Sequence, residues 1–399
     1  MLRFTHHSRL RPASEFRRST SHKHIGLLVL YFSLLCVPIH SLSFAQESLP
    51  SPALISKAIG LETLRIPPYV ARFGRSDPII VVVGENTFTE LTDYVVPFGV
   101  FSESGVTQVF ALATKAGPMQ MFPALRIQPQ KTTSEFDIDF PQGADYVIVP
   151  AVHKPNDPDL IQWVLSQAKK GATIVGICDG VWVVANGGLL TGRRAVGHWF
   201  SFDRLIKRFP ETTFVKNRRY ISDEQVITTT GVTASVPVSI ALIEAIAGRS
   251  HAAAIAQSLG IQNWSTSHPS QEFHLSVNHI FTAAKNWLSF WSHETVGIPI
   301  ASGIDEISLA LVSDAISRTY RSSAYTLAAS VSMIETKHGL LVIPDRTTQP
   351  PKRSDRTIEL PISGLRSAES LDWCLSHIAT IYGSATSAFV ALQLEYPKQ

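Results

Sequence analysis

Short apolar runs of strand length alternate with stretches of helical periodicity through the middle of the chain. The strand-like runs are Ile79 to Val83, Thr107 to Ala113, Tyr146 to Val149, Thr173 to Ile177 and Gln225 to Thr229. The helical stretches between them are Leu91 to Ser104, Asp157 to Lys170 and Val236 to Ala247. Such alternation is typical of a parallel β-sheet with helices on both faces. The sequence therefore predicts an α/β fold whose reactive groups lie outside the carboxyl ends of the strands.

One cysteine lies where such a fold places reactive groups. Cys178 stands between Gly176 and Gly180, after the fourth apolar run and before the helix-like segment Val181 to Leu190. The pattern predicts a strand-to-helix turn that the two glycines let the backbone make. Because a helix N-terminus favours a thiolate, Cys178 is a candidate nucleophile. The alternative is that this residue is a small buried apolar group.

The N-terminus has the features of an export signal. Residues 1–23 carry six Arg or Lys and one acid, and residues 25–45 are uncharged and apolar, ending in Ser43-Phe44-Ala45. We expect 1–45 to be a signal peptide cleaved after Ala45, followed by a Pro-rich linker over 46–76. The protein would then lie in the periplasm or cell envelope. The alternative is an uncleaved helix over 25–45 that anchors the chain in the inner membrane.

Charge and composition limit the partners. The whole chain has a net charge of +3, and the leader accounts for more than all of it, so the remainder is close to −2. We therefore expect no nucleic-acid partner. Only Cys178 and Cys374 remain beyond the leader, which is too few for a disulfide framework. The histidines show no metal-ligand spacing, so neither a metal nor a cofactor is expected.

Several motifs together resemble one superfamily. They are the Gly-x-Cys-x-Gly turn around Cys178, the run Ala185 to Ala195, the pair His198-Trp199 and the segment Val226 to Ser235. The chain resembles the ThiJ/PfpI branch of the glutamine amidotransferase-like superfamily. The likeness is closest to the amidase-like sensor domain of AraC-type regulators and to isocyanide hydratases. It implies a flavodoxin-like parallel sheet sandwiched by helices over residues 77–290.

The resemblance also assigns roles to single residues. It makes Cys178 the nucleophile and His198 its general base, and it makes Asp93, four residues before Pro97, the carboxyl group beside the thiol. The non-catalytic alternatives are that His198 is a packed core residue and that Asp93 is a solvated helix residue.

This chain departs from the family pattern beside the expected site. The family's Pro-Gly-Gly turn reads Pro150-Ala151-Val152 here, so only the N–H of Ala151 remains to form an oxyanion hole. Asp179 and Gly180 complete the expected pocket. An ionised Asp179 beside the thiol is expected to raise the thiol pKa.

The C-terminal part shows no helix-turn-helix pattern, although AraC-type regulators carry such a domain. Instead Asp305 to Ile316 aligns with Thr89 to Val100 at an offset of 216 residues, with Leu309 in the position of Asp93. We expect residues 291–399 to be a degenerate second copy of the α/β fold. This copy lacks the turn around Cys178, which is called the elbow below. That copy would cover the first domain as an intramolecular pseudo-dimer. The alternative is a chance likeness between two α/β segments.

Two functions fit these features. The first is an exported cysteine-dependent hydrolase or hydratase (a lyase) acting on a small carbonyl- or nitrogen-containing molecule. The second is a non-catalytic small-molecule sensor or binding protein of the cell envelope, derived from the regulators' sensor domain.

Overall fold

The computed structural model describes residues 66–347, 356–360, 362 and 364–397. All of them belong to one unit, Ile59–Gln399. The predicted leader over 1–45 and the first part of the predicted linker lie outside the described residues. Within the described ranges, no helix has both the length and the apolar character needed to cross a bilayer.

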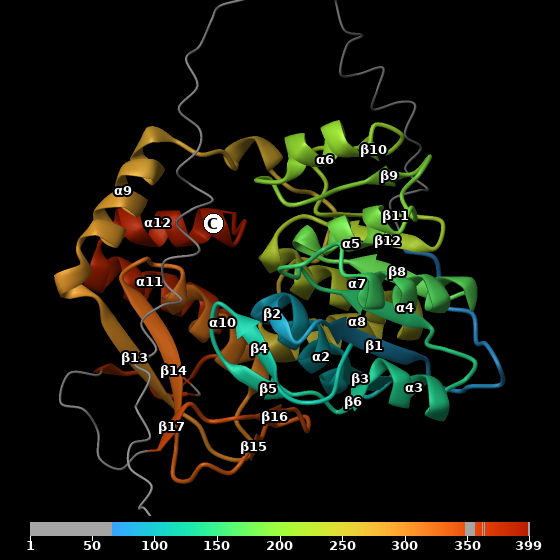
Figure 1. The fold of residues 1–399 in the computed structure, drawn as a ribbon, viewed down its shortest axis with the longest axis horizontal. Coiled ribbons are helices and arrows are strands. Elements are labelled where there is room, and N and C mark those ends of the chain that lie inside the picture. The colour runs from blue at the N-terminus through green and yellow to red at the C-terminus, as the bar shows by residue number, and fades with distance from the viewer. Residues whose placement is uncertain (1–65, 348–355, 361, 363, 398–399) are drawn as a thin grey trace, which may run out of the picture. The chain divides into compact units, whose positions relative to one another are not determined.

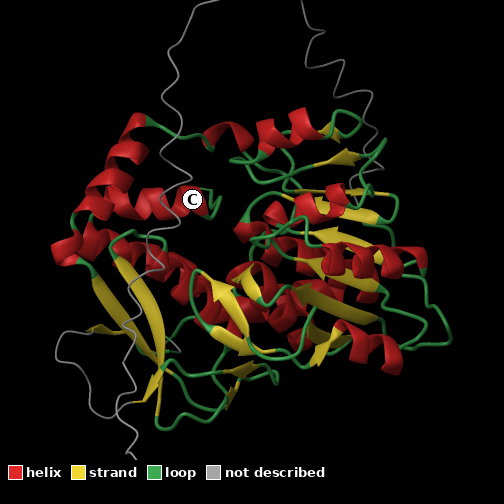
Figure 2. Ribbon diagram, viewed as in Figure 1, coloured by secondary structure: helices red, strands yellow, loops and turns green. Residues whose placement is uncertain are grey.

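The main sheet has seven strands in the order β11-β12-β8-β7-β1-β3-β6 (Figures 1 and 2). They are β1 (Ile79–Gly84), β3 (Gln108–Ala113), β6 (Lys131–Thr132), β7 (Tyr146–Val149), β8 (Thr173–Gly176), β11 (Tyr220–Asp223) and β12 (Val226–Thr229). Only the pair β11 and β12 is antiparallel. The five predicted strands are thereby confirmed as β1, β3, β7, β8 and β12. Their order, β3-β1-β7-β8-β12, is the flavodoxin-like order with one switch point next to β1.

Helices cover both faces of this sheet because β1 alternates its side chains between two apolar clusters. Ile80 and Val82 belong to one cluster, and Val81 and Val83 belong to the other. The first cluster is covered by α2 (Leu91–Ser104), α7 (Ser235–Ala247) and α8 (Arg249–Leu259). The second is covered by α3 (Thr133–Asp139), α4 (Pro158–Lys169) and α5 (Val181–Asn186). The predicted α/β fold with a two-faced parallel sheet is confirmed.

The C-terminal part has its own parallel sheet, in the order β17-β14-β13-β18. Its strands are β13 (Glu294–Pro299), β14 (Ser322–Ala328), β17 (Arg346–Thr347) and β18 (Arg356–Thr357). Its helices are α9 (Val277–Leu288), α10 (Glu306–Ser317), α11 (Ser370–Tyr382) and α12 (Ser384–Gln393). Within the first part, between α5 and β11 along the chain, lie α6 (Phe202–Arg208) and the short pair β9 (Arg194–Ala195) and β10 (Thr213–Phe214).

A third sheet joins strands from both parts of the chain, in the order β15-β16-β5-β4-β2. Its strands are β2 (Thr87–Glu90), β4 (Met119–Phe122), β5 (Arg126–Gln128), β15 (Ile334–Glu335) and β16 (Leu341–Val342). The pairing of β5 with β16 is antiparallel, with Ile127 opposite Val342. Residues more than 200 positions apart in the sequence therefore share one ladder.

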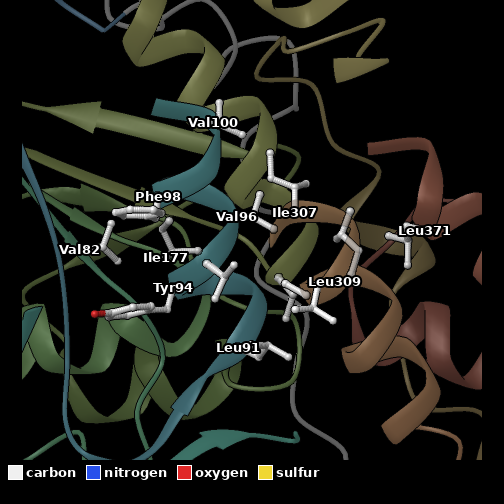
Figure 3. Packing of buried hydrophobic residues seen from close by; sticks show 14 of the residues in the cluster. Val82, Leu91, Tyr94, Val96, Phe98, Val100, Ile177, Ile307, Leu309 and Leu371 are labelled. Carbon is white, nitrogen blue, oxygen red and sulfur yellow. The ribbon is translucent and has the colours of Figure 1, made fainter. Parts of the chain in front are cut away.

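Helix α10 packs against α2 through apolar side chains. Figure 3 shows Ile307 and Leu309 of α10 beside Val96 of α2, with Leu371 of α11 beyond them. Gly99 of α2 sits under Ile307, because a Cβ built on this glycine would lie 2.6 Å from the Ile307 side chain. The two helices thus meet along a buried seam that belongs to the same apolar cluster as one face of the main sheet.

Polar contacts also link the two parts near this seam. The imidazole of His338 lies between the carboxylates of Glu306 and Glu103, and Lys337 pairs with Glu103. Burial opposes the charged form of this imidazole, but the hydrogen bond to Glu306 and the charges of both carboxylates outweigh it and raise the pKa of His338. The charged form of the His338 imidazole is therefore favoured at this seam.

Candidate functional site

The predicted strand-to-helix turn is present. Strand β8 ends at Gly176, and a single 3₁₀ turn over Cys178–Gly180 leads into α5. Cys178 has a φ of 55°, in the left-handed region that costs a non-glycine residue about 1–2 kcal/mol. Its N–H donates to the carbonyl of Thr230 at 3.1 Å, which helps to hold this conformation. Gly180 is required by close approach, since a Cβ there would lie 2.0 Å from the carbonyl oxygen of Val149.

The thiol of Cys178 is buried, with 6% of the residue exposed. Burial raises the pKa of Cys178 well above its ordinary value, and the carboxyl groups of Asp93, Asp179 and Glu90 raise it further. The backbone N–H of Asp179 at the turn acts in the opposite direction and is outweighed. The turn thus acts in the expected direction, but the burial and the negative surroundings exceed its contribution, and the role of Cys178 as nucleophile stays a prediction. The expectation that Asp179 raises the thiol pKa agrees with the structure.

The structure brings Asp93 to the same place. Asp93 is fully buried in the first turn of α2, which excludes the alternative that it is solvated. Its Oδ2 accepts the N–H of Ala151 at 3.2 Å, and its Oδ1 is buried without a hydrogen-bond partner. Burial raises the pKa of Asp93 well above its ordinary value; the Ala151 N–H lowers it and the nearby Asp314 raises it again. The one backbone donor expected for an oxyanion hole is thus engaged by a carboxyl group.

A second set of buried charges lies beside Asp93. Arg318, one residue past the end of α10, donates to Glu90 Oε1 and to Asp314 Oδ1, both at 2.5 Å. Asp314 Oδ2 accepts from the hydroxyl of Thr92 at 2.6 Å. Burial raises the pKa of Glu90 well above its ordinary value; Arg318 lowers it, while Asp314 and Asp93 raise it. The C-terminal part therefore supplies charged groups at the edge of the thiol site.

His198 is buried and bonded away from the thiol. Its Nδ1 accepts the N–H of Phe200 at 3.3 Å, and its Nε2 lies 3.3 Å from the carbonyl of Gln393. Nδ1 thus acts as an acceptor, and Nε2 lies where it can donate to the carbonyl. Glu395 lies next to it, 3.9 Å from Nε2, and accepts the N–H of Gly231 at 2.7 Å. Both ring nitrogens are engaged by the backbone, and the role of His198 as general base remains a prediction.

Asp179 points to a different neighbour. Its Oδ2 accepts from the hydroxyl of Ser201 at 2.8 Å, and Ser201 in turn accepts from Arg204 at 3.0 Å. Its Oδ1 is buried without a partner. The site therefore contains two buried carboxyl oxygens without hydrogen-bond partners, Oδ1 of Asp93 and Oδ1 of Asp179. Among the described residues, no hydrogen bond joins either carboxyl group to a histidine, lysine or arginine side chain.

Clefts of about 270 and 220 Å³ lie away from this site. The larger one is bordered by Tyr69, Arg72, Asp145 and Thr173, at the end of the sheet where β8 begins, whereas Cys178 follows the end of β8. Over the described part of the chain, no group of three or more histidine, cysteine or acidic residues has a geometry suited to a metal ion.

Sequence reasoning missed Glu90, Asp314 and Arg318. Glu90 directly precedes the predicted helix, as an N-terminal acid often does. Asp314 was visible as a single acid inside the apolar run Leu309 to Ile316, with Arg318 four residues later. A charge inside an apolar helix signals a buried ion pair, but nothing in the sequence indicates that this pair reaches α2.

The comparisons with known proteins agree with the motifs around the elbow. Residues 78–245 match the model of the DJ-1/PfpI family. The HTH-type transcriptional regulator CdhR of Pseudomonas aeruginosa is 37% identical over 86 residues, which cover 22% of this chain and 25% of the regulator. The match thus spans about a quarter of that relative's length.

Solved structures with a similar fold cover about half of the chain. Drosophila melanogaster DJ-1beta is 16% identical, with a TM-score of 0.42, covering 47% of this chain and 100% of its own. A ThiJ/PfpI family protein from Pseudomonas syringae is 18% identical, with a TM-score of 0.41, covering 53% and 80%. An AraC family transcriptional regulator from Pseudomonas putida is 13% identical, with a TM-score of 0.40, covering 45% and 98%. With the family match, the two-faced sheet and the elbow in place, residues 78–245 are a DJ-1/PfpI domain of the ThiJ/PfpI branch.

Proposed function

We propose that this protein binds a small carbonyl- or nitrogen-containing molecule at the Cys178 site and acts as a sensor or binding protein without turnover. The observation that carries the proposal is the set of carboxyl groups around a buried thiol, two of which, Asp93 and Asp179, have a buried oxygen without a hydrogen-bond partner. A cysteine nucleophile needs the thiolate, and here burial, Asp93, Asp179 and Glu90 all oppose it. A neutral thiol beside a neutral acid is a pair of polar groups suited to hydrogen bonding a ligand.

Two further contacts support binding over covalent catalysis. The N–H of Ala151 is occupied by Asp93, so a developing oxyanion would compete with that carboxyl group for its donor. His198 uses both ring nitrogens on backbone groups, so it would have to rotate before it could take a proton from Cys178.

A second candidate function is a hydratase or hydrolase that relies on Asp93 as the acid. The unpartnered Oδ1 of Asp93 and the strained φ of Cys178 favour it. A carboxyl group kept protonated in a buried site can donate a proton to a substrate, and backbone strain concentrates at functional sites. Turnover of small amides, aldehydes or isocyanides that is lost in Asp93→Asn would support this candidate over a sensor.

The experiment that tests the proposal measures the alkylation rate of Cys178 by iodoacetamide from pH 6 to pH 11. Peptide mass spectrometry separates this cysteine from Cys374, which is fully buried and serves as the internal control. We expect the midpoint for Cys178 to lie clearly above the value of about 8.5 for a free thiol. A midpoint at or below 8.5 would mean an activated nucleophile and would reject the sensor in favour of the cysteine-dependent enzyme.

We also propose that the protein is exported, with the periplasm or envelope as its location. The support for this is the basic segment 1–23 followed by the uncharged segment 25–45. Cleavage after Ala45 is the form we favour over an uncleaved anchor.

A further inference from the structure

A buried ion network connects the C-terminal part to the start of α2. The side chains of Glu90, Asp314 and Arg318 are 8%, 1% and 11% exposed. Arg318 bonds to both carboxylates, and Thr92 closes the network by donating to Asp314. The backbone N–H of Glu90 donates to the carbonyl of Ala151 at 2.8 Å. The network therefore fixes the same turn of backbone that places Asp93 against Ala151.

The hydrogen bonds of Arg318 within the network go to Asp314 and Glu90 rather than to Asp93. Three carboxyl groups lie near the guanidinium of Arg318. It donates hydrogen bonds to Glu90 and Asp314, and neither of these bonds goes to Asp93. The charge of Arg318 lowers the pKa of Asp93, while the charges of Asp314 and Asp179 raise it. Burial outweighs the charge of Arg318 and raises the pKa of Asp93, so the protonated forms of both Asp93 and the neighbouring thiol are favoured.

The C-terminal part also contacts His198 and Gly231, two further residues of the DJ-1/PfpI domain. The backbone carbonyl of Arg318 accepts from the side chain of Gln393 at 2.9 Å. The carbonyl of Gln393 is the group that His198 Nε2 faces, and Glu395, two residues on, accepts the N–H groups of Gly231 and Trp199. The same C-terminal segment thus holds the imidazole and the Gly-rich turn after β12.

We propose that Asp314 and Arg318 are positioning residues of the Cys178 site, by which the C-terminal part acts as a built-in partner for the DJ-1/PfpI domain. They hold Glu90 and the first turn of α2, and they keep Asp93 facing the thiol. Neither residue touches the thiol. This inference rests on the proposed function, because it says how the binding-competent, protonated state of that site is maintained.

The arrangement of the contacts around α2 and α10 supports a partner role. At the offset of 216 residues, β13 corresponds to β1, α10 to α2, β14 to β3 and β16 to β5. Strands β5 and β16 correspond to each other at this offset, and they also pair with each other in an antiparallel ladder. A self-complementary contact of this kind is what two related copies form about a two-fold axis. On this proposal both copies lie in one chain, and the second has Leu309 where the first has Asp93.

The test uses two near-isosteric variants of the full-length protein, Asp314→Asn and Glu90→Gln. Each removes one negative charge from the network and retains a hydrogen-bonding side chain for Arg318. Lys337→Met is the matched control, because it removes an ion pair between the same two parts, with Glu103, outside the network. Thermal unfolding of each variant reports stability, and the pH profile of Cys178 alkylation reports the site.

We expect each network variant to lower the alkylation midpoint of Cys178 by about half a pH unit or more, since one fewer negative charge opposes the thiolate. At a fixed pH below the midpoint this is a roughly threefold faster reaction. The control should leave the midpoint where it is. If both network variants change only the unfolding temperature and keep the wild-type midpoint, the two residues are merely structural and the inference fails. That outcome is separate from a failure of the proposed function, which depends on the absolute midpoint in the unmodified protein.

Discussion

Replacing Leu309 by alanine should destabilise both parts of the chain together. Leu309 is 1% exposed on α10 and packs in the apolar cluster that contains α2. A buried Leu→Ala change leaves a cavity and costs about 2–5 kcal/mol, and we expect about 3 kcal/mol because the α2 seam is closely packed. With a slope of about 3 kcal/mol per molar urea for a chain of this size, the unfolding midpoint should fall by about 1 M.

The two free cysteines in the described part of the chain make this prediction specific. Cys178 reports on the DJ-1/PfpI domain and Cys374, on α11, reports on the C-terminal part; both are buried. Pulse alkylation across a urea series should show both thiols becoming reactive at one midpoint, and Leu309→Ala should shift both equally. Leu288→Ala, at a position that is 57% exposed, is the matched control and should shift neither by more than about 0.5 kcal/mol. Separate midpoints in the wild type, or a shift of Cys374 alone, would refute the idea of one cooperative unit.

Three other changes have defined outcomes. Gly180→Ala places a Cβ 2.0 Å from the Val149 carbonyl oxygen and should lower the free energy of unfolding, measured by chemical denaturation, by about 3 kcal/mol. The control Gly187→Ala, whose Cβ would have its nearest contact at 3.3 Å, should lower it far less. Equal effects would contradict the close-approach argument. His338 has a raised pKa in the folded state, so its stabilisation is complete below its unfolded pKa of about 6.5 and is lost as the pH rises through the folded value. His338→Gln should flatten this decline in unfolding free energy above about pH 6.5, and an unchanged slope would exclude the imidazole as its source. N-terminal sequencing of protein purified from the cell envelope should begin at Gln46, and an intact residue 1 would show that the leader is retained.

Much of the fold could be predicted because its signals are local. Each strand of the main sheet that the sequence revealed is a continuous apolar run, and the helix Leu91–Ser104 has the bounds that its periodicity predicted. The segment after the elbow was predicted as helix through Leu190, but α5 ends at Asn186. The pair Gly187-Gly188 explains the difference, since glycines lack helix propensity and Gly188 has a φ of 75°.

The site was less predictable because its decisive contacts are long-range. The motif placed Cys178 at a turn and Asp93 near it, and both lie there. The charge state of the site depends on Arg318, more than 200 residues further along the chain from Asp93, and no local pattern reports that contact. The orientation of His198 depends on the carbonyl of Gln393 in the same way. A motif can identify the residues of a site, but their protonation depends on what packs against them.

The ladder between β5 and β16 has a consequence for how this chain reaches its fold. Until residue 341 has been synthesised, β5 presents an open edge and α2 presents Val96 and its apolar neighbours without cover. Open strand edges and exposed apolar faces are the surfaces through which chains aggregate. The DJ-1/PfpI domain therefore lacks the cover for one strand edge and one apolar helix face until nearly the whole chain is available.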